Sequence, residues 1–273
     1  MPDCKPTSAG PIPSALASAA LTQAGFSHAF FTRAGGVSRP PWDTLNFAAG
    51  TGDDPAAVRK NFALAAQILG VTASRLYVVS QVHGVAARVI EEGEDREDVL
   101  RAIADITLSR APGVACGVRT ADCVPILIAD RTSGAVAAIH SGWKGTVANV
   151  AAAGVRALRD LIGARGDFLA AIGPHIETCC FEVGADVAAE LAACSSLGGA
   201  AVIPGDKPHV NLRAIVRAQL EAEGLAATAI DDVRGCTVGD RDRFHSFRRD
   251  GKVGGRLLSA IVVPASASGG VKL

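Results

Sequence analysis

The stretch VACGVRTADCVPILIADRTSGAVAAIH, residues 114–140, contains three short apolar runs separated by turn-forming residues. Runs of this length that are rich in branched apolar residues predict buried strands, here over 114–119, 124–129 and 135–140. Similar apolar runs before and after this stretch predict further strands over 76–82, 169–173 and 257–263. Apolar residues at helical spacing predict helices over 55–69, 146–162, 184–194 and 212–223. The first of these has Asp54 and Pro55 at its start and Gly70 at its end, as capping preferences predict.

The order of these elements predicts the fold class. Strands cluster in the middle of the chain and helices are interspersed, which indicates an α/β (mixed α+β) fold with mixed β-sheets covered by helices in a single compact domain. No change in composition marks a linker, so we expect one catalytic domain over 13–263 with flexible ends at 1–12 and 264–273. The acidic stretch 91–101 is expected to be a solvated loop, and 14–25 a short helix rather than an export signal.

Composition excludes several classes of function. Lys+Arg and Asp+Glu balance at 27 each and only 4% of residues are aromatic, so neither a positive field nor stacking platforms favour nucleic acid as a partner. No apolar run is long enough to span a membrane. Seven cysteines without framework spacing indicate reduced thiols, and therefore a cytoplasmic protein.

Three reactive residues stand at or just after the ends of apolar runs: His83, Cys123 and His140. Sites collect at strand ends in open sheets, and the neighbouring Gly84 and Gly142 leave room for a ligand. Two imidazoles and a thiolate form a three-ligand set for Zn²⁺ with the fourth position open, which is typical of a catalytic metal site. Each residue alone is more often a packed core residue, so this prediction depends on the set.

A series of motifs follows one another along the chain. They are Phe30-Phe31-Thr32-Arg33-Ala34-Gly35-Gly36-Val37-Ser38, Leu45-Asn46, Gln81-Val82-His83-Gly84, Thr120-Ala121-Asp122-Cys123-Val124-Pro125, His140-Ser141-Gly142-Trp143-Lys144-Gly145-Thr146, the run from Ile172-Gly173-Pro174 to Cys180-Phe181-Glu182-Val183-Gly184, and Ser246-Phe247-Arg248-Arg249-Asp250. In this order they make the chain resemble, over nearly its whole length, the laccase-domain (YfiH-type) family. That family was long labelled polyphenol oxidase and is now regarded as purine nucleoside phosphorylase.

The resemblance implies roles for individual residues. It makes His83, Cys123 and His140 the catalytic residues and the metal ligands. Ser141 and Lys144 replace the family's usual Ala and Arg, and a lysine lacks the planar fork of arginine, which puts only the anion site in doubt. The substrate-binding candidates are Arg33, Asn46, Lys144, Cys180 and Arg248. Asp122, beside Cys123, is a candidate acid or base, or else holds a turn by hydrogen bonding.

The activity that the resemblance implies is metal-dependent phosphorolysis of purine nucleosides. Adenosine or inosine and phosphate would give the free base and ribose 1-phosphate, with adenosine deaminase and methylthioadenosine phosphorylase as further activities. The partners are then a purine nucleoside and phosphate, and the cofactor is Zn²⁺, with copper as the alternative ion. The residues leave the native metal, the preferred nucleoside and the oligomeric state open.

Two other enzymes use the same atoms. Cys123 as nucleophile with His140 or His83 as base would give a Cys-His hydrolase or amidase, for example on a cell-wall precursor. A copper polyphenol oxidase (laccase) is less favoured, because blue copper adds an axial Met and the only methionine is Met1. A non-enzymic binding module is the third class, and the open ligand position argues against it.

Overall fold

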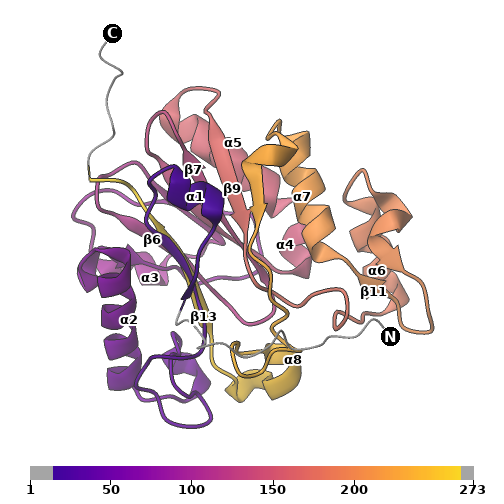
Figure 1. The fold of residues 1–273 in the computed structure, drawn as a ribbon, viewed down its shortest axis with the longest axis horizontal. Coiled ribbons are helices and arrows are strands. Elements are labelled where there is room, and N and C mark those ends of the chain that lie inside the picture. Colours follow the sequence, from indigo (N-terminus) through magenta and orange to yellow (C-terminus); the bar gives the residue numbers. More distant parts are fainter. Residues whose placement is uncertain (1–14, 266–273) are drawn as a thin grey trace.

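Two β-sheets form the centre of the molecule, and the computed structural model describes residues 15–265 (Figure 1). The first sheet has five strands in the spatial order β1 (Ala15–Leu16), β2 (His28–Phe31), β13 (Leu257–Val262), β6 (Ala115–Thr120) and β3 (Leu76–Tyr77). The second has six, in the order β12 (Ile230–Asp232), β9 (Phe168–Ile172), β7 (Val124–Asp130), β8 (Val136–Ser141), β5 (Ile106–Ser109) and β4 (Ala87–Val89). A separate pair joins β10 (Val202–Ile203) to β11 (His209–Val210).

Helices lie outside the two sheets. They are α1 (Ala19–Gln23), α2 (Pro55–Leu69), α3 (Arg96–Arg101), α4 (Trp143–Val147), α5 (Val150–Ile162), α6 (Ala185–Ala193), α7 (Leu212–Ala222) and α8 (Phe247–Asp250). Figure 1 shows α2 on one side of the sheets and α5 and α7 on the other. Both sheets contain parallel and antiparallel neighbours, so the predicted mixed α/β fold in a single domain is confirmed. None of the described helices is long and apolar enough to cross a membrane.

The alternation of side chains along each strand builds this layered core. On β7, Ile126 and Ile128 pack in the cluster that also contains the buried faces of α5 and α7, whereas Leu127 joins the cluster between the two sheets. On β13, Leu258 and Ala260 pack with the buried face of α2. Because successive side chains of a strand point to opposite faces, a strand buried on both sides needs a continuous apolar run, which is what residues 124–129 supply.

Four predicted elements differ from the structure. The helix expected over 14–25 is confined to Ala19–Gln23, because Ala15–Leu16 pairs with β2 as strand β1. The strand expected over 76–82 ends at Tyr77, because the chain beyond it turns so that residues 82–84 bond a side chain instead of a strand. The helix expected over 146–162 is broken into α4 and α5 at Asn149, which has φ +60° and caps α5 with its side chain. The acidic stretch expected to be a loop contains α3, whose first N–H groups are capped by Asp95. The helix expected over 55–69 is confirmed with its caps at Asp54 and Gly70.

The pairing of strands places the reactive residues at one edge of the second sheet. Strands β7 and β8 are antiparallel neighbours with Pro125 opposite His140, so Cys123, just before β7, lies beside the end of β8. Asp105 comes just before β5, and its carbonyl accepts a hydrogen bond from the His140 N–H at 2.8 Å. The predicted flexible ends, 1–12 and 264–273, lie outside the described residues apart from 264 and 265, so that expectation remains a prediction.

Candidate functional site

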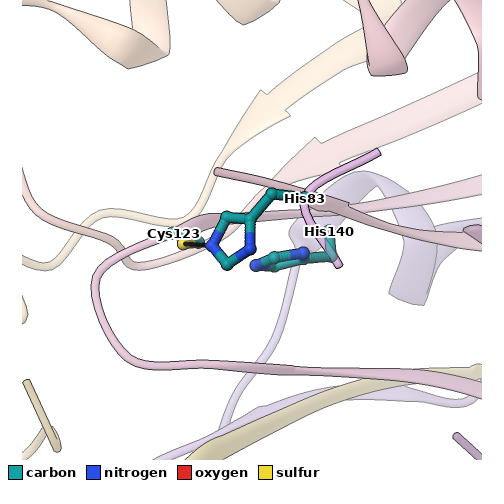
Figure 2. Close-up of side chains that lie close together, drawn as sticks. All are labelled: His83, Cys123 and His140. Atoms are coloured by element: carbon teal, nitrogen blue, oxygen red, sulfur yellow. Dashed lines mark hydrogen bonds between the residues drawn. The ribbon is translucent and has the colours of Figure 1, made fainter. Parts of the chain in front are cut away.

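The side chains of His83, Cys123 and His140 come together at this edge (Figure 2). Each offers one ligand atom, and these atoms all lie within 4.8 Å of one another. Cys123 Sγ is 3.7 Å from His83 Nε2, and the two imidazole rings meet edge to face with centroids 4.8 Å apart. His140 is buried and His83 is exposed, so the cluster has a closed side toward the sheet and an open side toward solvent.

A buried carboxylate, Asp105, organises two of the three residues. Its Oδ1 lies 2.7 Å from His140 Nδ1 and also accepts the main-chain N–H of His83 at 2.9 Å. Its Oδ2 accepts the N–H groups of Val82 at 3.2 Å and Gly84 at 2.6 Å. Because Asp105 bonds Nδ1, the other ring nitrogen of His140, Nε2, faces the cluster. Metal-binding histidines commonly have such a carboxylate at the ring nitrogen that does not bind the ion. Asp105 therefore fixes both the loop that carries His83 and the ring orientation of His140.

The backbone at two positions of the site adopts the left-handed region that non-glycine residues avoid. His83 has φ +64° and Asp122 has φ +87°. Such conformations cost about 1–3 kcal/mol each and persist only where surrounding contacts enforce them. At His83 the contacts are the N–H bonds to Asp105, and at Asp122 its carbonyl accepts the N–H of Ile176 at 2.9 Å. Both residues are thus held in place by bonds that a regular strand would not provide.

Charges within the cluster stabilise one another. Burial opposes ionisation of Cys123, but the positive charge of His140 and hydrogen bonds from both imidazoles outweigh it and lower the pKa of the thiol to about 6. Burial likewise disfavours protonated His140, but the Cys123 thiolate and Asp105 outweigh it and raise its pKa to about 9. Asp105 is buried too, yet its bonds to His140 and to main-chain N–H groups lower its pKa. The cluster therefore holds a thiolate at neutral pH.

The donor set and its spacing fit Zn²⁺. Tetrahedral zinc with bonds of about 2.3 Å to sulfur and 2.0–2.1 Å to nitrogen places a sulfur and a nitrogen ligand roughly 3.6 Å apart. The Cys123–His83 separation of 3.7 Å matches this value. A thiolate and two imidazole nitrogens are also the ligand types that zinc prefers, and binding the ion would displace the proton that His140 carries in the metal-free cluster. His83, Cys123 and His140 would hold the ion, and the open side of the cluster would leave one position for another ligand.

Gly142 gives the cluster the room it needs. A Cβ atom at this position would lie 2.3 Å from His83 Cδ2 and 3.1 Å from Cys123 Sγ. We expect Gly142→Ala to push the exposed His83 ring outward and to weaken zinc binding by roughly 10- to 100-fold, the range seen when a ligand loses its support. Competitive titration of the purified variant with a zinc chelator measures this. Gly145→Ala is the matched control, because its Cβ would lie 3.3 Å from Val150 Cγ1 and at ordinary contact distances of 3.5 and 3.7 Å from the Gly84 and His140 carbonyls, away from the ligand atoms; equal losses in both variants would contradict the account.

A cavity of about 750 Å³ opens in front of the cluster and has a cationic wall. Arg119 and Arg256 lie on neighbouring strand segments at positions that share one face, since Leu258 is the register partner of Arg119. Arg119 Nη2 donates to the carbonyl of Val79 at 2.9 Å, and Arg256 Nη1 donates to those of Gly254 and Gly255 at 2.7 and 3.0 Å. No ion pair found among residues 15–265 involves either arginine.

The charged groups near the two guanidiniums differ. Burial lowers the pKa of Arg119, and the positive charge of Arg256 lowers it further. Burial also lowers the pKa of Arg256, although Cys123 and Asp122 act in the opposite direction. Two half-buried like charges beside one cavity would both be stabilised by an anion, and a guanidinium pair suits the oxygens of phosphate. The cavity is therefore suited to an anionic ligand.

Two of the predicted substrate-binding residues lie away from this cavity. Arg33 borders a second cavity of about 450 Å³, together with two further arginines and three aspartates. Its guanidinium donates to the carbonyls of Asp43 at 2.9 Å and Arg241 at 3.0 Å. Asn46 is fully buried, where its amide bonds Asp53 and the main chain of Arg256. The structure thus gives Arg33 and Asn46 loop-holding contacts and does not bring them to the cluster.

The remaining candidates divide between the cavity and its outer wall. Lys144 is exposed, with its ammonium 5.6 Å from the ring centroid of Trp143, and it does not line the cavity. Cys180 packs behind the wall, where its carbonyl accepts from Arg248 at 3.5 Å. Arg248 lines the cavity, although its guanidinium is held by the carbonyl of Glu182 at 3.0 Å. Of these three, only Arg248 is placed where it can meet a ligand.

Asp122 lines the cavity but both of its carboxylate oxygens have partners. Oδ1 accepts the hydroxyl of Thr237 at 2.6 Å and Oδ2 accepts the main-chain N–H of Arg248 at 2.6 Å. Asp122 also lies in the turn between β6 and β7, not on a strand. Of the two roles considered from the sequence, these contacts favour the one that holds a turn.

Several residues of the site carry no signal in the sequence. Asp105 follows an apolar run without a motif, and Arg119 and Arg256 reach one cavity only because β6 and β13 pair. Gln81 stood inside a recognised motif, and the structure shows its amide donating to the carbonyl of Arg119 at 2.7 Å and accepting the N–H of the same residue at 2.8 Å. Asp105 directly precedes β5, a strand that the sequence pattern did not predict, so its place at the sheet edge could not be foreseen.

The fold and the site define an α/β domain with a His-Cys-His cluster at the head of a cationic cavity. The family described as multi-copper polyphenol oxidoreductase laccase matches residues 27–264, and the chain belongs to this family. The resemblance seen in the sequence motifs is thus confirmed.

Relatives and solved structures agree with this assignment. A protein of Streptomyces coelicolor named purine nucleoside phosphorylase is 40% identical over 232 residues, which cover 85% of this chain and 93% of that protein. One of Pseudomonas aeruginosa with the same name is 40% identical over 227 residues, or 82% and 88%. The crystal structure of the Bacillus licheniformis hypothetical protein YfiH is 27% identical and has a TM-score of 0.85, covering 93% of this chain and 97% of that one.

Proposed function

We propose that this protein is a purine nucleoside phosphorylase, whose catalytic domain is the region 13–263. The observation that carries the proposal is the pair Arg119 and Arg256, two half-buried cations on the wall of the cavity that also contains Cys123 and the two histidines. A hydrolase or an oxidase acting on a neutral substrate has no use for such a pair, whereas phosphate as a co-substrate does. The names of the relatives support the same activity.

The walls of the cavity suggest how the substrates bind. Trp143, Phe181 and Phe247 offer apolar and aromatic surface to a purine base. The arginine pair would hold phosphate against the anomeric carbon of the sugar, which supplies proximity and charge stabilisation. A phosphate oxygen then forms a bond to the anomeric carbon while the bond between that carbon and the purine nitrogen breaks, and the proton of hydrogen phosphate passes to the departing base. Zn²⁺ held by His83, Cys123 and His140 would supply Lewis-acid polarisation.

Dependence on phosphate tests the activity. With inosine or adenosine, we expect release of free base to rise with phosphate concentration and to saturate, and ribose 1-phosphate to appear in equal amount. Chromatography of base and sugar products across a phosphate series measures both. Unchanged base release in phosphate-free buffer, with plain ribose as the product, would contradict the proposal.

The proposal extends to related substrates and to the compartment. Methylthioadenosine presents the same base and glycosidic bond, so we propose it as a further substrate. Deamination of adenosine would be hydrolytic chemistry at the purine amino group and belongs to the same metal site, with Zn²⁺ favoured over copper by the donor set. The irregular cysteine spacing supports a cytoplasmic enzyme.

One observation favours a second candidate. Asp105, His140 and Cys123 form a chain in which the carboxylate orients the imidazole and the imidazole adjoins the thiol, as in Cys-His hydrolases. Such an enzyme would be insensitive to chelators and inactivated by alkylation. The Cys123→Ser variant separates it from the phosphorylase.

A multi-copper oxidase is not supported by the histidines. Apart from the cluster, His175 and His245 are fully buried, with pKa values lowered to about 4, mainly by burial. The ring of His28 bonds the main chain of Ser18 and Phe26, and that of His209 bonds the carbonyl of Thr178. The described residues therefore offer one imidazole pair for a metal, which is too few for several copper ions.

A further inference from the structure

A second cluster of metal-binding side chains lies outside the site described above. The sulfur atoms of Cys179, Cys180 and Cys236 all lie within 4.8 Å of one another. Cys179 Sγ is 3.5 Å from Cys180 Sγ and 3.6 Å from Cys236 Sγ. Nothing in the proposed phosphorylase reaction uses these three residues.

The fold brings the two segments of this cluster together. Strands β9 and β12 are parallel neighbours, so the loops that follow them leave the sheet at the same edge. Two main-chain hydrogen bonds join the loops, from His175 N–H to the Gly235 carbonyl at 3.1 Å and from Thr237 N–H to the His175 carbonyl at 3.0 Å. The turn that carries Cys179 and Cys180 is closed by the Cys180 N–H bonding the Glu177 carbonyl at 2.9 Å. Both segments are therefore fixed before any ligand arrives.

The spacing of the sulfurs fits a common metal ion better than a disulfide. Two thiolates on one tetrahedral Zn²⁺, with bonds of about 2.3 Å, lie roughly 3.8 Å apart. A disulfide requires about 2.05 Å, and adjacent cysteines such as Cys179 and Cys180 reach it only with strain. The separations of 3.5 and 3.6 Å are close to the ligand spacing.

The surroundings of Cys236 favour a thiolate. Its Sγ accepts the main-chain N–H of Gly239 at 3.5 Å. The three cysteines are half-buried, and their sulfur atoms already lie close together. Thiolate ligands select soft cations over Mg²⁺ or Ca²⁺.

We propose that Cys179, Cys180 and Cys236 form a second metal site, which binds a thiophilic closed-shell cation such as Zn²⁺. Three thiolates leave one position of a tetrahedral ion to a further ligand. The segment that carries Cys179 and Cys180 continues into Phe181, which lines the cavity. An ion at this site would hold that part of the wall in place without taking part in the reaction.

Zinc stoichiometry and cobalt spectroscopy test the proposal on the full chain. Reduced, metal-free protein is titrated anaerobically with Zn²⁺ and, separately, with Co²⁺, whose near-ultraviolet thiolate charge-transfer band grows with the number of sulfur ligands. We expect two zinc ions per chain in the natural sequence. Cys123→Ser should lose one ion and keep roughly three-quarters of the cobalt band, because three of the four thiolates remain.

The complementary variants decide the outcome. Cys236→Ser should lose the other ion and most of the band, and Cys179→Ser, which removes the sulfur that lies 3.5 and 3.6 Å from the other two, should do the same. Cys194→Ser is the matched control, because Cys194 is half-buried, donates to the Leu191 carbonyl at 3.2 Å and belongs to neither cluster. A single zinc ion that Cys123→Ser abolishes, or a Cys179–Cys236 disulfide formed in place of metal uptake, would overturn the proposal. Either result leaves the phosphorylase assignment intact.

Discussion

Cys123→Ser is expected to lose zinc from the His-Cys-His cluster and to lose nucleoside phosphorolysis together. A serine hydroxyl stays protonated at neutral pH and is a poor substitute for a thiolate whose pKa is lowered to about 6. Changing a residue that only supports a ligand lowers metal affinity or activity about 10- to 100-fold. We therefore expect that changing Cys123 itself lowers turnover at least about a hundredfold. Metal analysis and phosphorolysis rates on the same preparation provide the measurement.

The combination of results identifies the role of Cys123. A variant that binds zinc at the cluster as tightly as before but is inactive would favour the Cys-His hydrolase, in which the thiolate is the nucleophile. A variant that keeps both zinc and activity would contradict both roles. Cys194→Ser serves as the control, because this thiol lies outside both cysteine-containing clusters.

The second large effect concerns phosphate. Arg119→Met and Arg256→Met keep much of the apolar stem but remove the charged fork. Loss of one charge-assisted contact costs about 1.5–3 kcal/mol, which corresponds to about a 10- to 150-fold rise in the KM for phosphate. We expect zinc content to stay unchanged, since neither arginine belongs to the cluster. Steady-state rates over a phosphate series at saturating inosine measure the effect.

A parallel variant tests the expectation that came from the sequence. Arg33→Met should change the KM for phosphate little, because the Arg33 guanidinium is bound by main-chain carbonyls beside a different cavity. If Arg33→Met raises this KM and Arg119→Met does not, the phosphate lies with Arg33 and the arginine pair is not the anion site.

The grouping of His83, Cys123 and His140 could be predicted because all three stand inside local motifs. His83, Cys123 and His140 each end or follow an apolar run, and antiparallel pairing of β7 with β8 then brings Cys123 beside His140. What the sequence could not supply was the partner that orders them. Asp105 acts through three N–H groups of the loop 82–84, and that contact depends on the loop leaving the strand path at Tyr77. Apolar periodicity gives no sign of such a departure.

The proposed anion site also depends on contacts between residues far apart in the sequence. Arg33 stands in a recognised motif, yet its guanidinium pairs with the Asp43 carboxylate at 3.5 Å and donates to the carbonyl of Arg241, which is distant in the sequence. Arg119 is the single cation of a buried strand, and Arg256 lies far from it in the chain, so their shared face follows only from the register of β6 with β13. Long-range strand register decides which charges meet in a cavity, and local patterns do not encode it.

The source of the oxygen on the sugar product tests the central claim most directly. Inosine is incubated with the enzyme and ¹⁸O-labelled phosphate in ordinary water, and the sugar product is examined by mass spectrometry. The account predicts ribose 1-phosphate in which all the phosphate oxygens, including the one bound to the anomeric carbon, are labelled. Ribose that carries an unlabelled solvent oxygen at that carbon, formed at the same rate whether or not phosphate is present, would contradict it.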